Sequence, residues 1–370
     1  MSTTDRTTNF PLPAPWHSES GLPAPRRLAV ADDRVRAATA HRLACEGTGL
    51  LWRGDYQGAR QLLRALERRI DRKAPAPAAT PAETFRLHHR FRAHRARVLG
   101  RLVVLLDPDH TLRLRRAPDV RAACTAAYGP PTGPLLVPLR ELLGVLGAHQ
   151  WRERGVTVPA LGGARIHPHY GVFTPVRGEY VDLVARTPLP GDATAFDLGT
   201  GTGVLAAVLA RRGVRRVVGT DISARARACA RDTVRSLSLA DRITITGPDL
   251  FPPGRASLVV CNPPWLPGRP ASTLEQGVYD PGGRMLHAFL SGLPDHLEPA
   301  GEGWLILSDL AEHLGLRTRA ALLTAIGAAG LRITGRTDTR PRHPRATDPA
   351  DPLHAARAAE TTSLWRLAPR

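Results

Sequence analysis

The chain has 370 residues, of which 42% are hydrophobic and 23% are charged. These proportions are typical of globular proteins and exclude disorder along the whole chain, and the length indicates about two domains. Fifty-one lysines and arginines against 33 aspartates and glutamates give a net charge of +18, with Lys73 as the single lysine. Such a balance favours acidic partners, namely nucleic acid or ribosomal surfaces, or reflects a basic surface that only keeps the protein in solution.

Several common classes of site are not expected. The cysteines form no CxxC pair, which argues against a zinc site and a disulfide framework and for a reducing cytoplasm. They are Cys45, Cys124, Cys229 and Cys261. His88-His89 and His167-x-His169 lack acids or cysteines at metal-ligand offsets, so we expect no metal. The first residues lack the apolar segment of a secretion signal, and the longest apolar run, 204–210, is too short for a bilayer. We therefore expect a cytoplasmic protein without membrane contact.

The N-terminal part is expected to be mostly α-helical. Residues 1–27 are rich in proline and predict a disordered tail, and residues 28–160 predict a domain that recognises the substrate. Within 56–70, apolar residues recur at helical spacing. They are Ala59, Leu62, Leu63, Leu66 and Ile70. Arg60, Arg64 and Arg68 follow another face, which is either solvated or a phosphate-contacting stripe.

Further elements follow in the N-terminal part. Residues 74–82 read as a Pro/Ala linker between two helical stretches. Residues 103–106 and 111–114, on either side of an Asp-Pro-Asp-His turn, predict a β-hairpin. Helical patterns continue through 119–128 and 135–149.

From residue 161 to the end, strands and helices alternate, which predicts a Rossmann-like α/β domain with a mostly parallel seven-stranded sheet. The expected strands are 193–198, 215–220, 242–246, 257–261, 303–308, 330–336 and 362–367. The expected helices are 203–212, 223–237, 283–297 and 310–328. The last two strands predict an antiparallel terminal hairpin, whose connection, 341–360, is a long basic loop.

A glycine-rich turn connects the first strand of this domain to its first helix. Asp197 precedes a Gly-x-Gly-x-Gly run formed by Gly199, Gly201 and Gly203. Glycines permit a tight turn and close approach of a ligand to the backbone. Asp221 ends the second strand, where a carboxylate can accept both hydroxyls of a ribose. NAD enzymes share such an acid, so Asp221 alone leaves the cofactor open.

Together these features resemble the class I S-adenosylmethionine-dependent methyltransferases. The resemblance implies that the glycine turn wraps the methionine end of S-adenosylmethionine, that Asp221 holds the ribose and that Asp249 meets the adenine amino group, with Leu250 and Phe251 at its border. The implied cofactor-binding residues are Phe173, Pro175, Asp197, Gly199, Thr200, Gly201, Gly203, Asp221, Ile222, Asp249, Leu250 and Asn262. The alternatives are an NAD(P) site, a degenerate fold that binds no cofactor and, for Asp249, an acid that only shapes a turn.

The fourth strand runs into Asn262-Pro263-Pro264-Trp265, the most specific motif of the chain. An amide or exocyclic amine is a poor nucleophile because its lone pair is delocalised. The Asn262 side-chain oxygen and the Pro263 carbonyl can accept its two N–H groups, and the prolines hold that carbonyl rigid. Trp265 can stack on the planar group. We expect these four residues to form the catalytic site, since positioning then supplies most of the rate acceleration. The alternative is a strand end that two prolines terminate.

This motif is similar to that of methyltransferases acting on planar nitrogens, and the HemK-like release factor glutamine methyltransferases are the best match. Their segment before the glycine turn resembles 173–184, where Arg177 and Glu179 either lie beside the substrate or form a surface ion pair. The match in 173–184 is loose, because one extra residue separates proline from arginine and Tyr180 is not the usual residue, and the motif region departs from both groups of enzymes. The stretch after the motif, 266–283, lacks the usual acidic-Pro-x-x-Ala-Leu run, and Trp265-Leu266 differs from the Phe-His of guanine-modifying rRNA enzymes.

The resemblance implies an S-adenosylmethionine-dependent methyltransferase that modifies a protein glutamine amide. Its partner would be a translation factor or a ribosomal protein. The alternatives are methylation of an exocyclic amine in rRNA, tRNA or DNA, and a non-catalytic protein that uses the fold to bind RNA or a partner. An NAD(P) oxidoreductase is the third class. The sequence does not indicate an oligomeric state.

Overall fold

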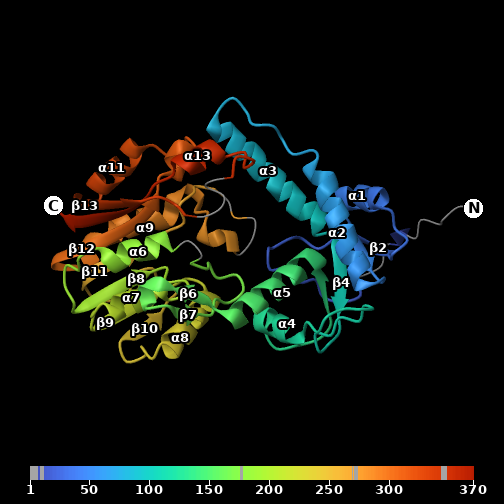
Figure 1. The fold of residues 1–370 in the computed structure, drawn as a ribbon, viewed down its shortest axis with the longest axis horizontal. Helices are drawn as coiled ribbons and strands as arrows, with labels where there is room; N and C mark the ends of the chain where they lie inside the picture. Colours follow the sequence, from blue (N-terminus) through green and yellow to red (C-terminus); the bar gives the residue numbers. More distant parts are fainter. Residues whose placement is uncertain (1–6, 9–11, 176–177, 269, 271–273, 343–347) are drawn as a thin grey trace, which may run out of the picture. The chain divides into compact units, whose positions relative to one another are not determined.

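The computed structural model describes residues 7–8, 12–175, 178–268, 270, 274–342 and 348–370. Contacts divide the chain into two compact units (Figure 1). The first comprises residues 1–77 and 86–150, and the second comprises residues 78–85 and 151–370. None of the helices in the described ranges has the length and apolarity that crossing a bilayer requires.

A seven-stranded sheet forms the second unit, in the order β10-β9-β8-β11-β12-β14-β13. Its strands are β8 (Thr194–Leu198), β9 (Arg216–Thr220), β10 (Ile243–Thr246), β11 (Ala256–Cys261), β12 (Leu297–Ser308), β13 (Leu331–Thr339) and β14 (Thr362–Pro369). Neighbours are parallel except at β14, which is antiparallel to β12 and β13. The predicted Rossmann-like class, with its antiparallel terminal hairpin, is confirmed.

Helices cover both faces of this sheet. They are α6 (Glu179–Arg186), α7 (Val204–Arg211), α8 (Ala224–Ser236), α9 (Arg284–His296) and α11 (Arg319–Ala328), whereas α10 (Leu310–His313) and α13 (His354–Ala359) pack with each other in a separate cluster. Because successive side chains of a strand point to opposite faces, β11 contributes side chains to two hydrophobic cores, one on each face of the sheet. Leu258 and Val260 pack with α6, α7 and α8, whereas Val259 and Cys261 pack with α9 and α11. Cys261 therefore points into a core.

Short elements complete the second unit. A two-stranded antiparallel sheet pairs β6 with β7. These elements are β6 (Val156–Val158), β7 (Ala164–Ile166) and the 3-10 helices η1 (Pro159–Leu161), η2 (Leu274–Gly277) and η3 (Pro281–Gly283).

The first unit contains a sheet that the sequence analysis did not predict. Its strands are β1 (Thr7–Thr8), β2 (Arg27–Ala31), β3 (Thr48–Trp52), β4 (Leu102–Leu106) and β5 (Leu135–Pro138), in that order across the sheet. Its helices are α1 (Ala37–Cys45), α2 (Tyr56–Asp71), α3 (Pro81–Leu99), α4 (Arg121–Tyr128) and α5 (Leu139–Arg154). The helix predicted over 56–70 and its buried stripe are confirmed. Short buried strands such as β2 and β3 are missed because a brief apolar run has no diagnostic period.

Two expectations for this unit are wrong. The predicted hairpin of 103–106 with 111–114 does not form, because β4 pairs with β3 and β5 instead. Residues 12–27 are ordered rather than a disordered tail. Ala14 packs with apolar residues on the face of the sheet opposite the main helical core. The Trp16 indole N–H donates to the Leu22 carbonyl at 2.8 Å. Ala14 and Trp16, which lie among the prolines, anchor the segment and explain why it is ordered.

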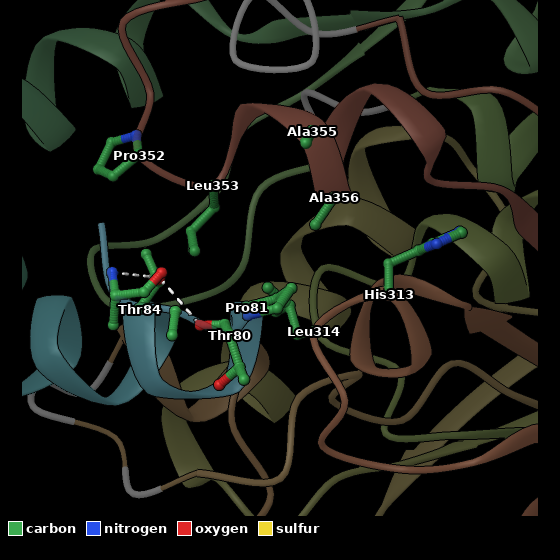
Figure 2. Close-up of a pocket in the computed structure, with 11 residues that line it drawn as sticks. Thr80, Pro81, Thr84, His313, Leu314, Pro352, Leu353, Ala355 and Ala356 are labelled. Carbon is green, nitrogen blue, oxygen red and sulfur yellow. Dashed lines mark hydrogen bonds between the residues drawn. The ribbon is translucent and has the colours of Figure 1, made fainter.

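The predicted long loop over 341–360 also differs from the structure. Residues 343–347 lie outside the described ranges, but 354–359 form helix α13. Ala356 of this helix packs with Leu310 of α10 and with Leu314, which follows α10. Ala356 and Leu314 line a pocket of about 410 Å³ together with residues 78–81 and Thr84 (Figure 2). The run of alanines at 355–359 has no apolar periodicity strong enough to predict this helix.

Candidate active site

The register of three strands brings the predicted functional residues to one edge of the sheet. Leu198, the last residue of β8, pairs with Thr220 of β9 and with Cys261 of β11. Neighbouring strands lie about 4.8 Å apart, so the residues that follow them emerge side by side. These residues are Gly199, Asp221 and Asn262. They lie at the carboxyl ends of parallel strands, where α/β sheets bind ligands.

The glycine turn has a backbone that other residues rarely adopt. Gly199, Gly201 and Gly203 have φ values of +69°, +55° and +78°. A Cβ at Gly203 would meet the Ala230 Cα of α8 at 3.2 Å, so this glycine permits close packing of the helices. At Gly201 a Cβ would approach only the Gly199 carbonyl oxygen, at 3.9 Å. The turn therefore presents bare backbone with open space at its middle glycine.

The Asp197 side chain stabilises the glycine turn through two hydrogen bonds. One carboxylate oxygen, Oδ2, accepts both the Thr200 hydroxyl at 2.6 Å and the Ala206 N–H at 3.0 Å. The second bond satisfies an N–H in the first turn of α7, which would otherwise lack a partner. Burial raises the pKa of Asp197 to about 6, opposed by these two hydrogen bonds. A cation close to this carboxylate would stabilise its ionised form.

Asp221 is held by backbone on both sides. Its Oδ2 accepts the Gly201 N–H at 3.0 Å and its Oδ1 accepts the Ser223 N–H at 2.8 Å. Burial raises the pKa of this carboxyl, and the two backbone hydrogen bonds oppose the rise. The next residue, Ile222, is 83% exposed, which is unusual for an isoleucine. Asp221 thus offers a carboxylate to hydroxyl groups, and the neighbouring Ile222 offers an apolar surface to a flat ring.

The catalytic motif contains a hydrogen bond that the sequence analysis did not predict. The Trp265 indole N–H donates to the Asn262 Oδ1 at 2.9 Å. An indole N–H can only donate, so the atom of Asn262 that faces it must be the oxygen. Pro263 is buried behind them, and Trp265 also packs against both cores of the sheet. The Asn262 carboxamide is therefore fixed in one orientation.

The segment before the glycine turn is partly buried. Pro175 is buried, and Phe173 lies against Gly277, where a Cβ would meet its side chain at 3.0 Å. Val176 and Arg177 lie outside the described residues. Glu179 is only 5% exposed and so does not lie on the surface, and its pairing with Arg177 falls outside the described residues. Its Oε1 is buried and has no hydrogen-bond donor among the described residues, which makes it a candidate to receive a ligand ammonium group.

The proposed adenine side is more open. Asp249 is exposed, and the Leu250 carbonyl accepts the Thr220 hydroxyl at 2.6 Å, which ties this loop to the end of β9. Phe251 does not line the site as expected. Its ring stacks on His296 of α9 at 4.2 Å and belongs to the core. The two prolines that follow Phe251 in the sequence do not predict that its ring packs in the core.

The sequence analysis missed the role of two residues after the motif. Asp280 Oδ2 accepts the Met285 N–H at 2.7 Å, and the Asp280 N–H donates to the Leu266 carbonyl at 2.9 Å. Met285 approaches the glycine turn so closely that a Cβ at Gly199 would lie 2.6 Å from its Cε. The sequence feature that could have indicated these contacts is the Asp-Pro-Gly-Gly string at 280–283. The contact of Met285 places the start of α9 over the glycine turn.

The histidines of the His167-x-His169 pattern make structural contacts, and Cys261 is buried. His169 Nε2 lies 2.8 Å from Asp232 Oδ2, and His167 Nδ1 lies 2.6 Å from the Arg152 carbonyl oxygen. Burial raises the pKa of the Cys261 thiol well above its usual range, which disfavours a nucleophilic thiolate. No group of three or more potential metal ligands occurs among the described residues.

Comparison with known proteins finds similarity over part of the chain. Residues 182–319 match the methyltransferase small domain. A release factor glutamine methyltransferase of Cereibacter sphaeroides is 33% identical over 172 residues, which cover 43% of this chain and 60% of that protein. The ribosomal RNA small subunit methyltransferase C of Alcanivorax borkumensis is 34% identical over 113 residues, which cover 30% of this chain and 31% of that protein.

A solved structure, the ribosomal protein L11 methylase of Lactobacillus delbrueckii subsp. bulgaricus, has a TM-score of 0.39 and 17% identity, covering 56% of this chain and 86% of that one. The chain thus spans about three fifths of the release factor relative and less of the rRNA relative. The predicted resemblance to HemK-like class I methyltransferases is confirmed for the catalytic unit.

Proposed function

We propose that this protein transfers a methyl group from S-adenosylmethionine to the side-chain amide of a glutamine in a protein substrate, which is a translation factor or a ribosomal protein. One observation carries the proposal. The glycine turn, Asp221 and Asn262 leave three adjacent strands at the same level, so a cofactor site and an amide-binding site adjoin. Translation takes place in the cytoplasm, where we expect the protein to act.

The residues of the site fit S-adenosylmethionine. Asp221 offers a carboxylate to the ribose hydroxyls, and the exposed Ile222 side chain offers an apolar surface to the adenine. The open backbone at Gly201 admits the methionine part. The unpartnered Oε1 of Glu179 and the buried Asp197 supply negative charge for its ammonium and sulfonium groups. When bound, the cofactor supplies a methyl group that is already electrophilic.

Asn262 and Pro263 prepare the acceptor nitrogen. An amide oxygen has two lone pairs, so Asn262 Oδ1 can accept one N–H of the target while it accepts the Trp265 indole. The Pro263 carbonyl accepts the second N–H. These two bonds hold the nitrogen with its lone pair turned towards the methyl group. After attack the nitrogen loses its proton to solvent, so no general base is needed before the transfer.

The relatives favour a glutamine target. The match to the release factor enzyme covers 43% of this chain, whereas the match to the rRNA enzyme covers 30%. The rRNA relative and the net charge of +18 support a nucleic-acid amine as the second candidate.

Tritiated S-adenosylmethionine and a ribosome-containing extract separate these targets. We expect label that protease releases and nuclease does not, in a protein of defined mass. Asn262→Ala should cut turnover at least about 100-fold with little change in cofactor affinity, as loss of one preorganised contact can do. Asp221→Ala should weaken cofactor binding by about 1–3 kcal/mol. If only nuclease released the label, the methylated group would be a base amine and not a glutamine amide.

A further inference from the structure

The positive charge of the chain is concentrated on one pair of helices. Residues 60–97, which include most of α2 and α3, contain eleven lysines and arginines against three acids. Their net charge of +8 is nearly half of the total of +18, on about a tenth of the residues. Sequence alone does not decide whether the arginine stripe of 60–68 is merely solvated or contacts phosphate.

None of the three acids neutralises the exposed arginines. Glu67 and Asp71 both pair with Arg95, at 3.3 and 2.8 Å. Glu83 accepts the Thr80 hydroxyl at 3.0 Å at the start of α3. Six of the exposed arginines in this range pair with no carboxylate in the part of the chain that the structure describes. They are Arg64, Arg68, Arg72, Arg86, Arg90 and Arg97.

The cations of neighbouring helices are close enough to influence one another. The pKa of His41 in α1 is lowered, first by burial and then by the charges of Arg69, Lys73 and His94. Arg69 lies in the last turn of α2, Lys73 follows the end of this helix, and His94 lies in α3. The C-terminal end of α2 and helix α3 therefore contribute to one positive field. We call it the basic surface. Its residues are Arg68, Arg69, Arg72, Lys73, Arg90, His94 and Arg97.

We propose that the basic surface binds the sugar-phosphate backbone of nucleic acid. Arginine guanidinium groups bind phosphate through two parallel hydrogen bonds, and rows spaced three or four residues apart lie along one face of a helix. The proposal goes beyond the methyl transfer. It holds whether the methylated group belongs to a protein or to a base, and it would bring the catalytic unit to a ribonucleoprotein.

A membrane surface fits the basic surface less well. Amphipathic helices that lie on bilayers insert large apolar side chains beside their basic residues. The exposed large apolar residues of the described ranges all lie outside α2 and α3. They are Val30, Trp151, Ile222, Leu323 and Ile333. The basic surface is charged without an apolar anchor, as expected for contacts to a phosphate backbone.

Binding of the full chain to a fluorescent RNA hairpin, a single-stranded RNA and a DNA duplex tests this proposal without cofactor. The test variant is R68A/R72A/R90A/R97A. We expect its dissociation constants to rise at least about tenfold at 0.1 M salt. Its slope of log affinity against log salt should fall by about three to four, because each lost phosphate contact removes close to one unit.

A matched control removes four exposed arginines from other places. R34A/R53A/R186A/R216A has the same net charge as the test variant, and we expect less than a twofold change. Equal losses in both variants would overturn the proposal, because only net charge would then matter. Binding to anionic phosphatidylserine vesicles or to polyglutamate as tightly as to RNA would also overturn it. Methyl transfer is not measured, so this result is independent of the proposed activity.

Discussion

The hydrogen bond between Trp265 and Asn262 indicates that the two side chains have different roles in the motif. Asn262 faces the acceptor nitrogen, and Trp265 holds the Asn262 carboxamide through its indole N–H at 2.9 Å. A phenylalanine could provide the same ring for stacking but not this N–H. Trp265 is therefore a positioning residue in addition to a stacking surface.

Trp265→Phe separates these two roles. We expect kcat to fall about tenfold, because a net hydrogen bond contributes about 1 kcal/mol and the freed carboxamide can rotate. Cofactor affinity should stay within about twofold, since Asp221 and the glycine turn are unchanged. Single-turnover kinetics and calorimetry measure the two quantities. A wild-type kcat in Trp265→Phe, together with loss in Trp265→Ala, would show that only the ring matters.

Asp197 makes the stability of the catalytic unit depend on pH. Burial raises its pKa from 3.8 to about 6 in the folded state. Protonation therefore stabilises the folded protein. This stabilisation is complete below about pH 4 and is lost as the pH rises through 6, and two pKa units correspond to about 3 kcal/mol.

Asp197→Asn should remove this dependence. Both hydrogen bonds of Asp197 end on Oδ2, so an amide oxygen can accept them in its place. Urea unfolding of the cofactor-free protein at pH 4.5, 5.5, 6.5 and 7.5 should show the variant gaining stability over the wild type as the pH rises. A constant difference across this range would mean that Asp197 is already ionised at the lowest pH.

At the scale of elements, the two units differ in how far the sequence predicts them. Apart from β10 and β11, which follow each other directly, the strands from β8 to β12 alternate with helices, so their order could be predicted. β2 and β3 are five-residue strands, and the buried leucines of β3 do not distinguish a strand from part of a helix. The 12–27 segment was misread because its proline content conceals Ala14 and Trp16, which anchor it.

The same limit applies to the site. Asp197, Asp221 and Asn262 stand at strand ends, so their convergence follows from the parallel topology. The burial of Glu179 and the contact of Met285 with the glycine turn arise from segments far apart in sequence. No local pattern encodes such contacts, and only the packed structure reveals them.

Glu141 fastens the N-terminal segment to α5. Its carboxylate accepts the Ser18 and Ser20 hydroxyls and the Glu19 N–H, the last at 2.8 Å. Glu141→Ala should lower the unfolding free energy by about 1–3 kcal/mol, because three donors lose their acceptor. Urea unfolding measures it, with Glu153→Ala on the same helix as the comparison. An equal effect of both substitutions would mean that the segment is held by Trp16 alone.

At the scale of the whole molecule, the two proposed functions fall in different units. The cofactor residues lie in the second unit, and the basic surface lies in the first. A ligand stabilises the elements that bind it, by about 2.7 kcal/mol at 100 times its dissociation constant. Each unit should therefore respond to its own ligand.

Hydrogen exchange with mass spectrometry reads out this division. Saturating S-adenosylhomocysteine should slow exchange in 194–222 and 256–290, because these segments form the glycine turn, the Asp221 loop, the catalytic motif and the start of α9. A saturating RNA hairpin should instead slow exchange in α2 and α3, at 56–99. Slower exchange in β8 and β11 with RNA alone would place the nucleic acid in the catalytic site, and the target amine would then belong to a base rather than a glutamine.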